Sequence, residues 1–190
     1  WLAADIPMGE VATIAAAYRH AARRAHKTLL IITPRRTEDT KAMEDAFRRD
    51  GLSIACRHHG EQPKEATQIY VVDTDEGLGL WCRLSSITYL GGSLSDGISP
   101  DPFVPALVGS AIVAGPHQEA YQTHFDRLLN AGAIKQVSTA DGLGRAIEDL
   151  LATDLAAQQA HAAWDVTSQG ADATNELMSV IYTYLDQVNT

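Results

Sequence analysis

The chain has 190 residues, of which 45% are hydrophobic and 21% charged, a composition typical of a globular protein with one ordinary domain or two small ones. Its formal net charge is −9, with the acidic residues spread along the chain. Because binding to nucleic-acid phosphates needs a basic surface, this charge argues against a nucleic-acid partner. No apolar run reaches the roughly 18 residues that predict a membrane-spanning helix.

The cysteines indicate the redox environment of the chain, and its first residues bear on whether it is part of a longer protein. Cys56 and Cys82 form no CxxC pattern and no framework typical of secreted domains, so two reduced, buried thiols are the favoured interpretation. The chain begins at Trp1 without an initiator methionine, and residues 1–4 resemble the inside of a strand. We therefore expect a piece of a longer protein, with any membrane anchor upstream.

Short apolar runs alternate with segments of helical apolar spacing from residue 8 onward. The run 28–33 stops at Pro34, as a buried strand does. Thr37 is placed to cap the next helix and Gly51 to end it. The predicted strands are 28–33, 52–57, 69–73, 86–92, 110–115 and 133–137. The predicted helices are 8–26, 37–51, 76–84, 102–109, about 118–131 and about 140–152.

Apolar runs separated by helices of suitable length predict an α/β fold, a doubly wound, Rossmann-like parallel sheet with helices on both faces. Two further helical stretches, 154–168 and 172–188, close the chain. One half of the sheet does not need these two additional helices to cover it. We expect these last helices, about 154–188, to pack toward a neighbouring domain.

In a doubly wound sheet, ligands bind at the carboxyl ends of the strands, where turns and helix N-termini present backbone N–H groups. Four segments fall at such ends: 33–36, 73–78, 91–102 and 115–117. No GxGxxG follows the first strand and no GxxxxGK[ST] occurs, so the dinucleotide interpretation is weak and a P-loop is excluded.

Two of these segments carry candidate anion-binding groups. Arg35 and Arg36 directly follow a strand and are able to clamp a phosphate, although a solvated basic pair at the start of a helix is equally consistent. Gly91 and Gly92 at a strand end allow close approach of a ligand to the backbone. Ordinary turn formation explains them equally well.

Histidines and acidic pairs are the remaining candidates. His117 follows Gly-Pro and is able to donate to a phosphate or sugar hydroxyl, although a lone histidine is more often structural. His58 and His59 lie in a polar loop in which we identify no acidic or cysteine partner at ligand spacing, so a metal site is not predicted. Glu44 and Asp45 lie on a predicted helix and are interpreted as a solvated face.

The order of the segments is more specific than any single motif. The chain resembles the C-terminal half of the 3-deoxy-D-manno-octulosonic acid (Kdo) transferases. This family consists of GT-B glycosyltransferases with two Rossmann-like halves, a donor, CMP-Kdo, bound mainly by the C-terminal half, and a general base in the N-terminal half. The segments that carry the resemblance are WLAADIPMGE, LLIITPRR, VVDTDEGLGLWCRLSSITYLGGSL, DPFVPALVGSAIVAGPH and LLNAGAIKQV.

Several family motifs are intact. Gly-Gly-Ser-Leu stands at 91–94 and Gly-Pro-His at 115–117, and the Pro-Arg of Pro-Arg-His is kept at Pro34 and Arg35. Gly9 and Glu10 are the surviving centre of a longer motif near the start.

Other positions depart from the family pattern. The family's Asn and Glu of the nucleotide site are replaced by Asp101 and Val104, and its Gly-Glu pair is exchanged in order at Glu76 and Gly77. A valine cannot accept hydrogen bonds from ribose hydroxyls, and an additional carboxylate repels an anionic donor. The segment 98–104 has therefore lost polar groups that a CMP-sugar site uses.

The resemblance implies a glycosyltransferase domain, residues 1–190, that binds the nucleotide sugar. It implies no catalytic residue in this chain, no metal, no cofactor, and no sugar transfer by the isolated chain. The implied nucleotide-sugar-binding residues are Pro34, Arg35, Glu76, Gly77, Leu78, Gly91, Gly92, Ser93, Asp101, Pro102, Val104 and His117.

The implied reaction is transfer of Kdo from CMP-Kdo to a lipid A precursor in lipopolysaccharide synthesis, at the cytoplasmic face of the bacterial inner membrane. The implied partners are the donor, the acceptor and an N-terminal domain, which would supply the membrane contact. Two alternatives stay open: a degenerate GT-B half that acts as a scaffold or binds a partner, and a transferase that uses another nucleotide sugar.

Overall fold

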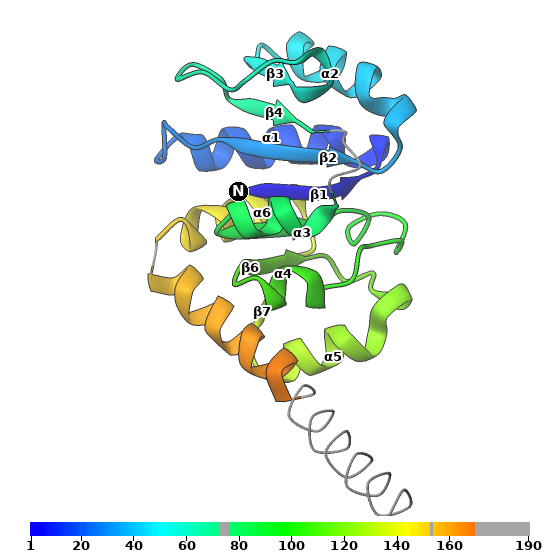
Figure 1. Cartoon of the computed structure of the whole chain (residues 1–190), viewed down its shortest axis with the longest axis vertical. Helices are drawn as coiled ribbons and strands as arrows, with labels where there is room; N and C mark the ends of the chain where they lie inside the picture. Colours follow the sequence, from blue (N-terminus) through cyan, green and yellow to red (C-terminus); the bar gives the residue numbers. More distant parts are fainter. Residues whose placement is uncertain (73–76, 153, 170–190) are drawn as a thin grey trace, which may run out of the picture.

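A computed structural model describes residues 1–72, 77–152 and 154–169. Within this part of the chain, seven parallel strands form one sheet in the order β3-β4-β2-β1-β5-β6-β7 (Figure 1). The strands are β1 Leu2–Ile6, β2 Leu30–Pro34, β3 Ile54–Cys56, β4 Ile69–Val71, β5 Ile87–Leu90, β6 Ala111–Ala114 and β7 Ile134–Gln136. The predicted α/β fold with a doubly wound sheet is confirmed.

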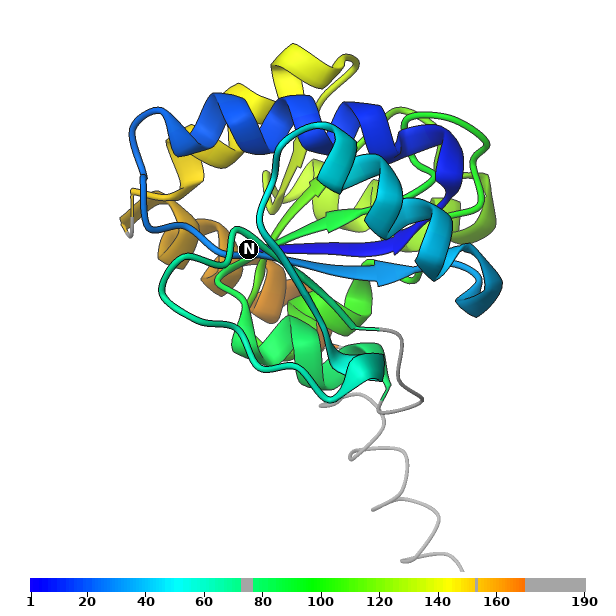
Figure 2. The same ribbon diagram turned by 90° about the horizontal axis from the view of Figure 1, so that it is seen from above.

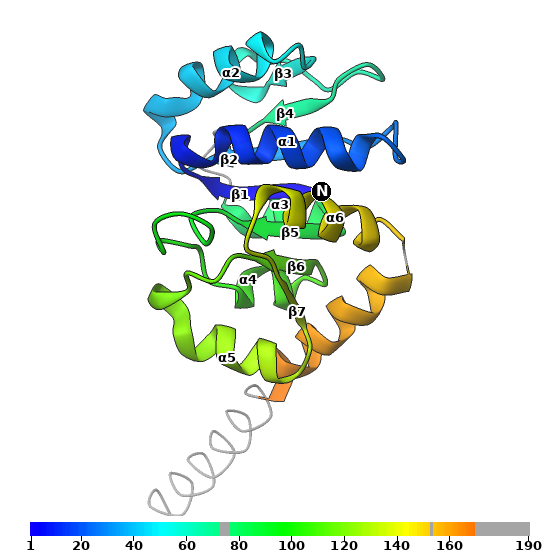
Figure 3. The same ribbon diagram turned by 180° about the vertical axis from the view of Figure 1, so that it is seen from behind.

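Helices cover both faces of this sheet (Figure 2). The helices α1, α2 and α6 pack on one face, where α6 lies along α1 (Figure 3). The helices α3, α4 and α5 and a helix over 154–169 pack on the other face. The α-helices are α1 Val11–Ala22, α2 Thr40–Arg49, α3 Leu78–Leu84, α4 Phe103–Leu107, α5 Gln122–Asn130 and α6 Ala140–Leu150. The 3-10 turns are η1 Met8–Glu10, η2 Thr37–Asp39, η3 Arg57–His59 and η4 Glu119–Tyr121.

The central strand is one that the strand count from the sequence left out. The sequence gives six apolar runs, and the structure adds β1 at the start of the chain, between β2 and β5. Leu2, Ala3, Ala4 and Ile6 are fully buried, because a central strand of a doubly wound sheet is covered on both faces.

The order in which the strands are added to the sheet reverses at β1, the central strand. β2, β4 and β3 lie on one side, and β5, β6 and β7 lie on the other. In such sheets the crevice outside the carboxyl ends of the two strands at the reversal is the usual ligand site. The residues that follow β1 and β5 therefore form the expected ligand site.

The described part of the final helical region packs on this domain. Ala163 and Val166 are buried against β6 and α5, and Arg127 of α5 donates to the Val166 carbonyl at 2.7 Å. The predicted helix 172–188 lies outside the described residues, and the packing of 154–188 toward a neighbouring domain stays a prediction. Within the described residues, no helix has the length and apolar character needed to cross a membrane.

Candidate functional site

A glycine turn joins the carboxyl ends of β5 and β1. The Gly91 N–H donates to the Ala4 carbonyl at 2.7 Å, and a Cβ at Gly91 would lie 2.5 Å from the Asp5 carbonyl oxygen. Gly92 has φ of 77°, and a Cβ there would overlap the Arg35 guanidinium and the Ile98 carbonyl. Both glycines are therefore required by the packing of the turn.

Arg35 is the cation of this turn, and acidic groups already surround it. Its Nε lies 3.2 Å from Asp5 Oδ2 and its Nη1 lies 2.7 Å from Asp96 Oδ2. Its Nη2 donates to the carbonyls of Asp5 and Ile98. Only 15% of the Arg35 side chain is exposed. A phosphate at this position would have to compete with two carboxylates.

The geometry of Asp5 explains how β1 supplies one of these carboxylates. The pairing of β1 with β2 shifts register between Ala3 and Ile6, and Asp5 there has φ of 57°, in the left-handed region that L-residues rarely adopt. The Asp5 N–H donates to Thr33 Oγ1 at 2.7 Å. This bulge turns the Asp5 side chain toward Arg35.

Glu10 binds the residues that follow the glycine turn. Its carboxylate is buried and accepts hydrogen bonds from the Tyr89 hydroxyl at 2.8 Å, the Ser95 hydroxyl at 2.7 Å and the Leu94 N–H at 3.2 Å. Burial, together with the adjacent Glu10 charge, raises the pKa of Tyr89 well above its ordinary value, so this hydroxyl remains a donor. Glu10 therefore holds residues 94–95 next to the start of α1.

Ser93 links β5 to β6 and positions the backbone of His117. The buried Ser93 hydroxyl donates to the Leu90 carbonyl and accepts from the Gly115 N–H at 2.7 Å. The His117 N–H donates to the Ser93 carbonyl at 3.0 Å. The imidazole is half exposed, with its Nδ1 3.9 Å from Glu119 Oε1. Ser93 thus has a structural role, and the His117 side chain stays accessible.

Asp101 and Val104 lie at the start of α4, and their side chains contact other residues of this chain. Asp101 Oδ1 accepts from the Phe103 N–H at 2.9 Å and lies 2.8 Å from His124 Nδ1. Pro102 precedes the first turn of the helix. Val104 packs with the apolar cluster beneath α3. Val104 thus supplies an apolar contact at the position where the family resemblance implies an acceptor.

An open pocket of about 340 Å³ lies at the carboxyl ends of β1 and β2. It brings together three predicted site residues, Pro34, Gly77 and Leu78. The Trp81 indole N–H beside them is buried and has no hydrogen-bond partner, although buried polar groups are normally paired. The pocket is lined by Asp5, Thr33, Pro34, Gly77, Leu78, Trp81 and Pro100.

The other predicted residues divide into two groups. The first group forms the turn beside the pocket and consists of Arg35, Gly91, Gly92 and Ser93. The second group does not line the pocket and consists of Asp101, Pro102, Val104 and His117. Glu76 lies outside the described residues.

The sequence analysis missed several residues of the site. Asp5, Glu10, Trp81 and Asp96 were not among the predicted site residues, although all four contact or line it. Only Glu10 carried a signal, because it belongs to the surviving Gly-Glu of the family motif. The others depend on contacts across the sheet that no local pattern reveals.

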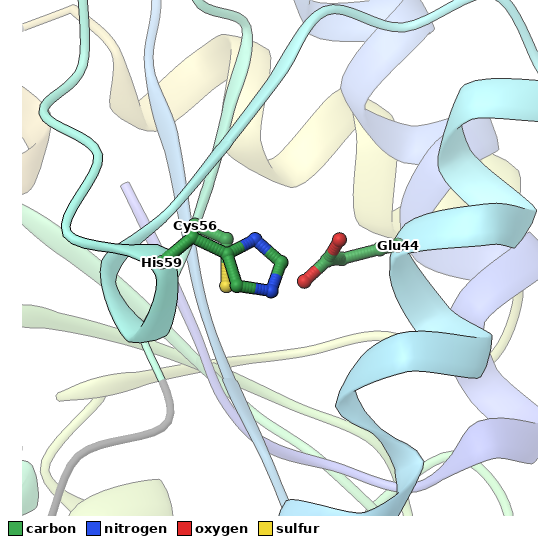
Figure 4. A group of neighbouring side chains, drawn as sticks. All are labelled: Glu44, Cys56 and His59. Atoms are coloured by element: carbon green, nitrogen blue, oxygen red, sulfur yellow. The ribbon is translucent and has the colours of Figure 1, made fainter.

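The structure gives one of the paired histidines neighbours that the sequence analysis did not identify. The structure places His59 beside Cys56 and Glu44, with their ligand atoms all within 4.8 Å of one another (Figure 4). The Glu44 side chain is 1% exposed, so it does not belong to a solvated face. The partners were missed because Cys56 precedes the loop within a strand and Glu44 lies on another element.

A seven-stranded parallel sheet with a glycine turn at its point of reversal defines a doubly wound, Rossmann-like domain. Its fold matches the C-terminal CMP-Kdo binding domain of WaaA from Acinetobacter baumannii, with a TM-score of 0.81 at 23% identity, over 87% of this chain and 86% of that one. It also matches alpha,alpha-trehalose 6-phosphate synthase from Burkholderia multivorans, with a TM-score of 0.60 at 14% identity, over 98% of this chain and 44% of that one.

The chain is homologous to the 3-deoxy-D-manno-octulosonic acid transferases. It is 27% identical over 189 residues to the enzyme of Haemophilus influenzae, covering 98% of this chain and 44% of the relative. It is 29% identical over 160 residues to a probable mitochondrial Kdo transferase of Arabidopsis thaliana, covering 80% of this chain and 35% of the relative. The chain thus spans less than half the length of these relatives. No family model matches it.

Proposed function

We propose that this chain is the nucleotide-sugar-binding domain of a Kdo transferase. The observation that carries the proposal is homology to these enzymes along 98% of the chain. The glycine turn at the reversal of the sheet lies where such domains bind ligands, which supports it further. In the whole protein the reaction would be transfer of Kdo from CMP-Kdo to a lipid A precursor at the cytoplasmic face of the inner membrane.

The pocket beside the turn is suited to the nucleoside part of such a donor. Pro34, Leu78 and Trp81 provide apolar walls for a nucleoside. The donor phosphate would lie near Arg35 and the accessible His117, where the Arg35 charge and a hydrogen bond from the imidazole would stabilise the departing CMP. Asp96, with 42% of its side chain exposed, is the carboxylate that the phosphate would displace from Arg35.

Calorimetric titration with CMP, UMP and GMP tests this proposal. We expect CMP to bind most tightly. Leu78→Asp places a charge in the pocket wall and should weaken CMP binding by about tenfold or more, since it costs apolar contact and repels the phosphate. Leu80→Asp is the matched control, because Leu80 lies on the same helix, is 43% exposed and does not line the pocket.

The same titration separates the alternatives. A scaffold or partner-binding half is favoured by the two carboxylates that already neutralise Arg35, and it predicts binding of none of the three nucleotides. A preference for UMP or GMP would indicate another nucleotide sugar. Equal effects of the Leu78 and Leu80 substitutions on CMP affinity would show that this pocket is not the nucleotide site.

A further inference from the structure

A cluster of three metal-ligating side chains lies at the edge of the sheet farthest from β7. Glu44 projects from α2, Cys56 ends the edge strand β3, and His59 ends the turn η3 (Figure 4). The imidazole and the carboxylate face each other across the cluster, and the Cys56 sulfur lies beside the ring. One ligand atom from each residue lies within 4.8 Å of those of the others.

The local fold brings the three residues together. Cys56 and His59 are three residues apart across a strand end and a single 3-10 turn, which Gly60 closes with φ of 72°. The Glu61 carboxylate accepts from the Cys56 N–H at 2.8 Å, and the Glu61 N–H donates to the Cys56 carbonyl at 3.2 Å. The loop is thus held against its own strand, under α2.

Glu44 supplies a second observation that points to a ligand. Its side chain is 1% exposed, and its Oε2 has no hydrogen bond. Nη1 of Arg48 lies 2.9 Å from this oxygen as an ion pair, but without the alignment of a hydrogen bond. Arg48 is 44% exposed and also lies 3.7 Å from Asp45, so it has an alternative partner. The buried carboxylate oxygen thus has one charged partner, which is half exposed, and no hydrogen bond, and a bound cation would give it a second partner.

We propose that Glu44, Cys56 and His59 bind a Zn²⁺ ion. Thiolate, imidazole and carboxylate together are ligands that zinc accepts, whereas Mg²⁺ and Ca²⁺ prefer oxygen alone. The thiolate and the carboxylate together neutralise the charge of the ion. Three protein ligands leave a fourth position for water, and the exposed His59 provides the entry path from solvent.

The distances allow such a site with a small adjustment. Tetrahedral zinc with bonds of about 2.0–2.3 Å places its ligand atoms roughly 3.3–3.8 Å apart. The widest separation in the cluster, at most 4.8 Å, therefore needs to close by about 1 Å. His59 is exposed and is able to turn toward the two buried ligands. Binding would tie the edge strand to α2 and stabilise the folded state.

Titration of the untagged chain with Zn²⁺, and with Co²⁺ as a spectroscopic probe, tests the proposal. We expect one Zn²⁺ per chain, a rise in the melting temperature, and a thiolate-to-cobalt charge-transfer band. His59→Ala should weaken Zn²⁺ binding by about tenfold or more, whereas the matched control His58→Ala should leave it within about twofold. Cys56→Ala should abolish the cobalt band, and Cys82→Ala should keep it.

The exposed position of His59 keeps the test decisive even if Cys56→Ala does not fold. Absence of Zn²⁺ binding by the wild-type chain would overturn the proposal. Equal losses in His58→Ala and His59→Ala, or a cobalt complex without a thiolate band, would also overturn it. These readouts do not involve nucleotide, so they are independent of the proposed function.

Discussion

Glu10 illustrates how one side chain positions a loop that lies far away in the sequence. Its two carboxylate oxygens accept three hydrogen bonds. Two of the donors, Leu94 and Ser95, lie 84 and 85 residues later in the chain. Buried donors without an acceptor are costly, so the removal of Glu10 should cost more than the removal of any one donor.

We expect Glu10→Ala to lower the free energy of unfolding by about 2–4 kcal/mol, because it leaves three donors without their acceptor. Tyr89→Phe removes one donor and should cost about 1 kcal/mol. Urea denaturation of both variants measures the difference. A Glu10→Ala variant as stable as Tyr89→Phe would contradict this role for the carboxylate.

At the scale of elements, the turn after β5 joins three strand ends. Gly91 contacts β1, Arg35 reaches from the end of β2, and Ser93 bonds to the residue after β6. The turn packs so closely because Gly92 has no side chain where the Arg35 guanidinium and the Ile98 carbonyl lie.

Gly92→Ala should therefore destabilise the domain by about 2 kcal/mol or more, through the positive φ and the overlap with Arg35. The matched control is Gly79→Ala, since Gly79 lies in α3 and a Cβ there meets no atom within 4 Å. Alanine is the better helix former, so the control should keep or raise stability by up to about 1 kcal/mol. Thermal unfolding of the two variants checks the sign, and equal melting temperatures would refute the argument.

At the scale of the whole molecule, the chain covers 44% of the length of its Haemophilus relative. The family resemblance implies a general base in the N-terminal half of such two-half enzymes and an active site in the cleft between the halves. A domain with its own core on both faces of the sheet should fold and bind ligand on its own.

We accordingly expect the isolated chain to bind CMP and to transfer no sugar from CMP-Kdo to a lipid A precursor. Product analysis by mass spectrometry measures this, with the Haemophilus influenzae Kdo transferase as the positive control. Transfer by the isolated chain would show that the catalytic groups lie within it.

The sequence by itself determined the class of fold, because the alternation of apolar runs and helical spacing is a local property that follows from burial on both faces of a parallel sheet. It also located the glycine turn at 91–92, where backbone conformation limits the residue type. Only the tertiary structure decided the partners. Arg35 and Asp96 are 61 residues apart, and Glu10 and Ser95 are 85 apart. Such pairs form when separate strands end at one edge of the sheet or a helix covers a strand end, and no pattern along the chain encodes which side chains then meet.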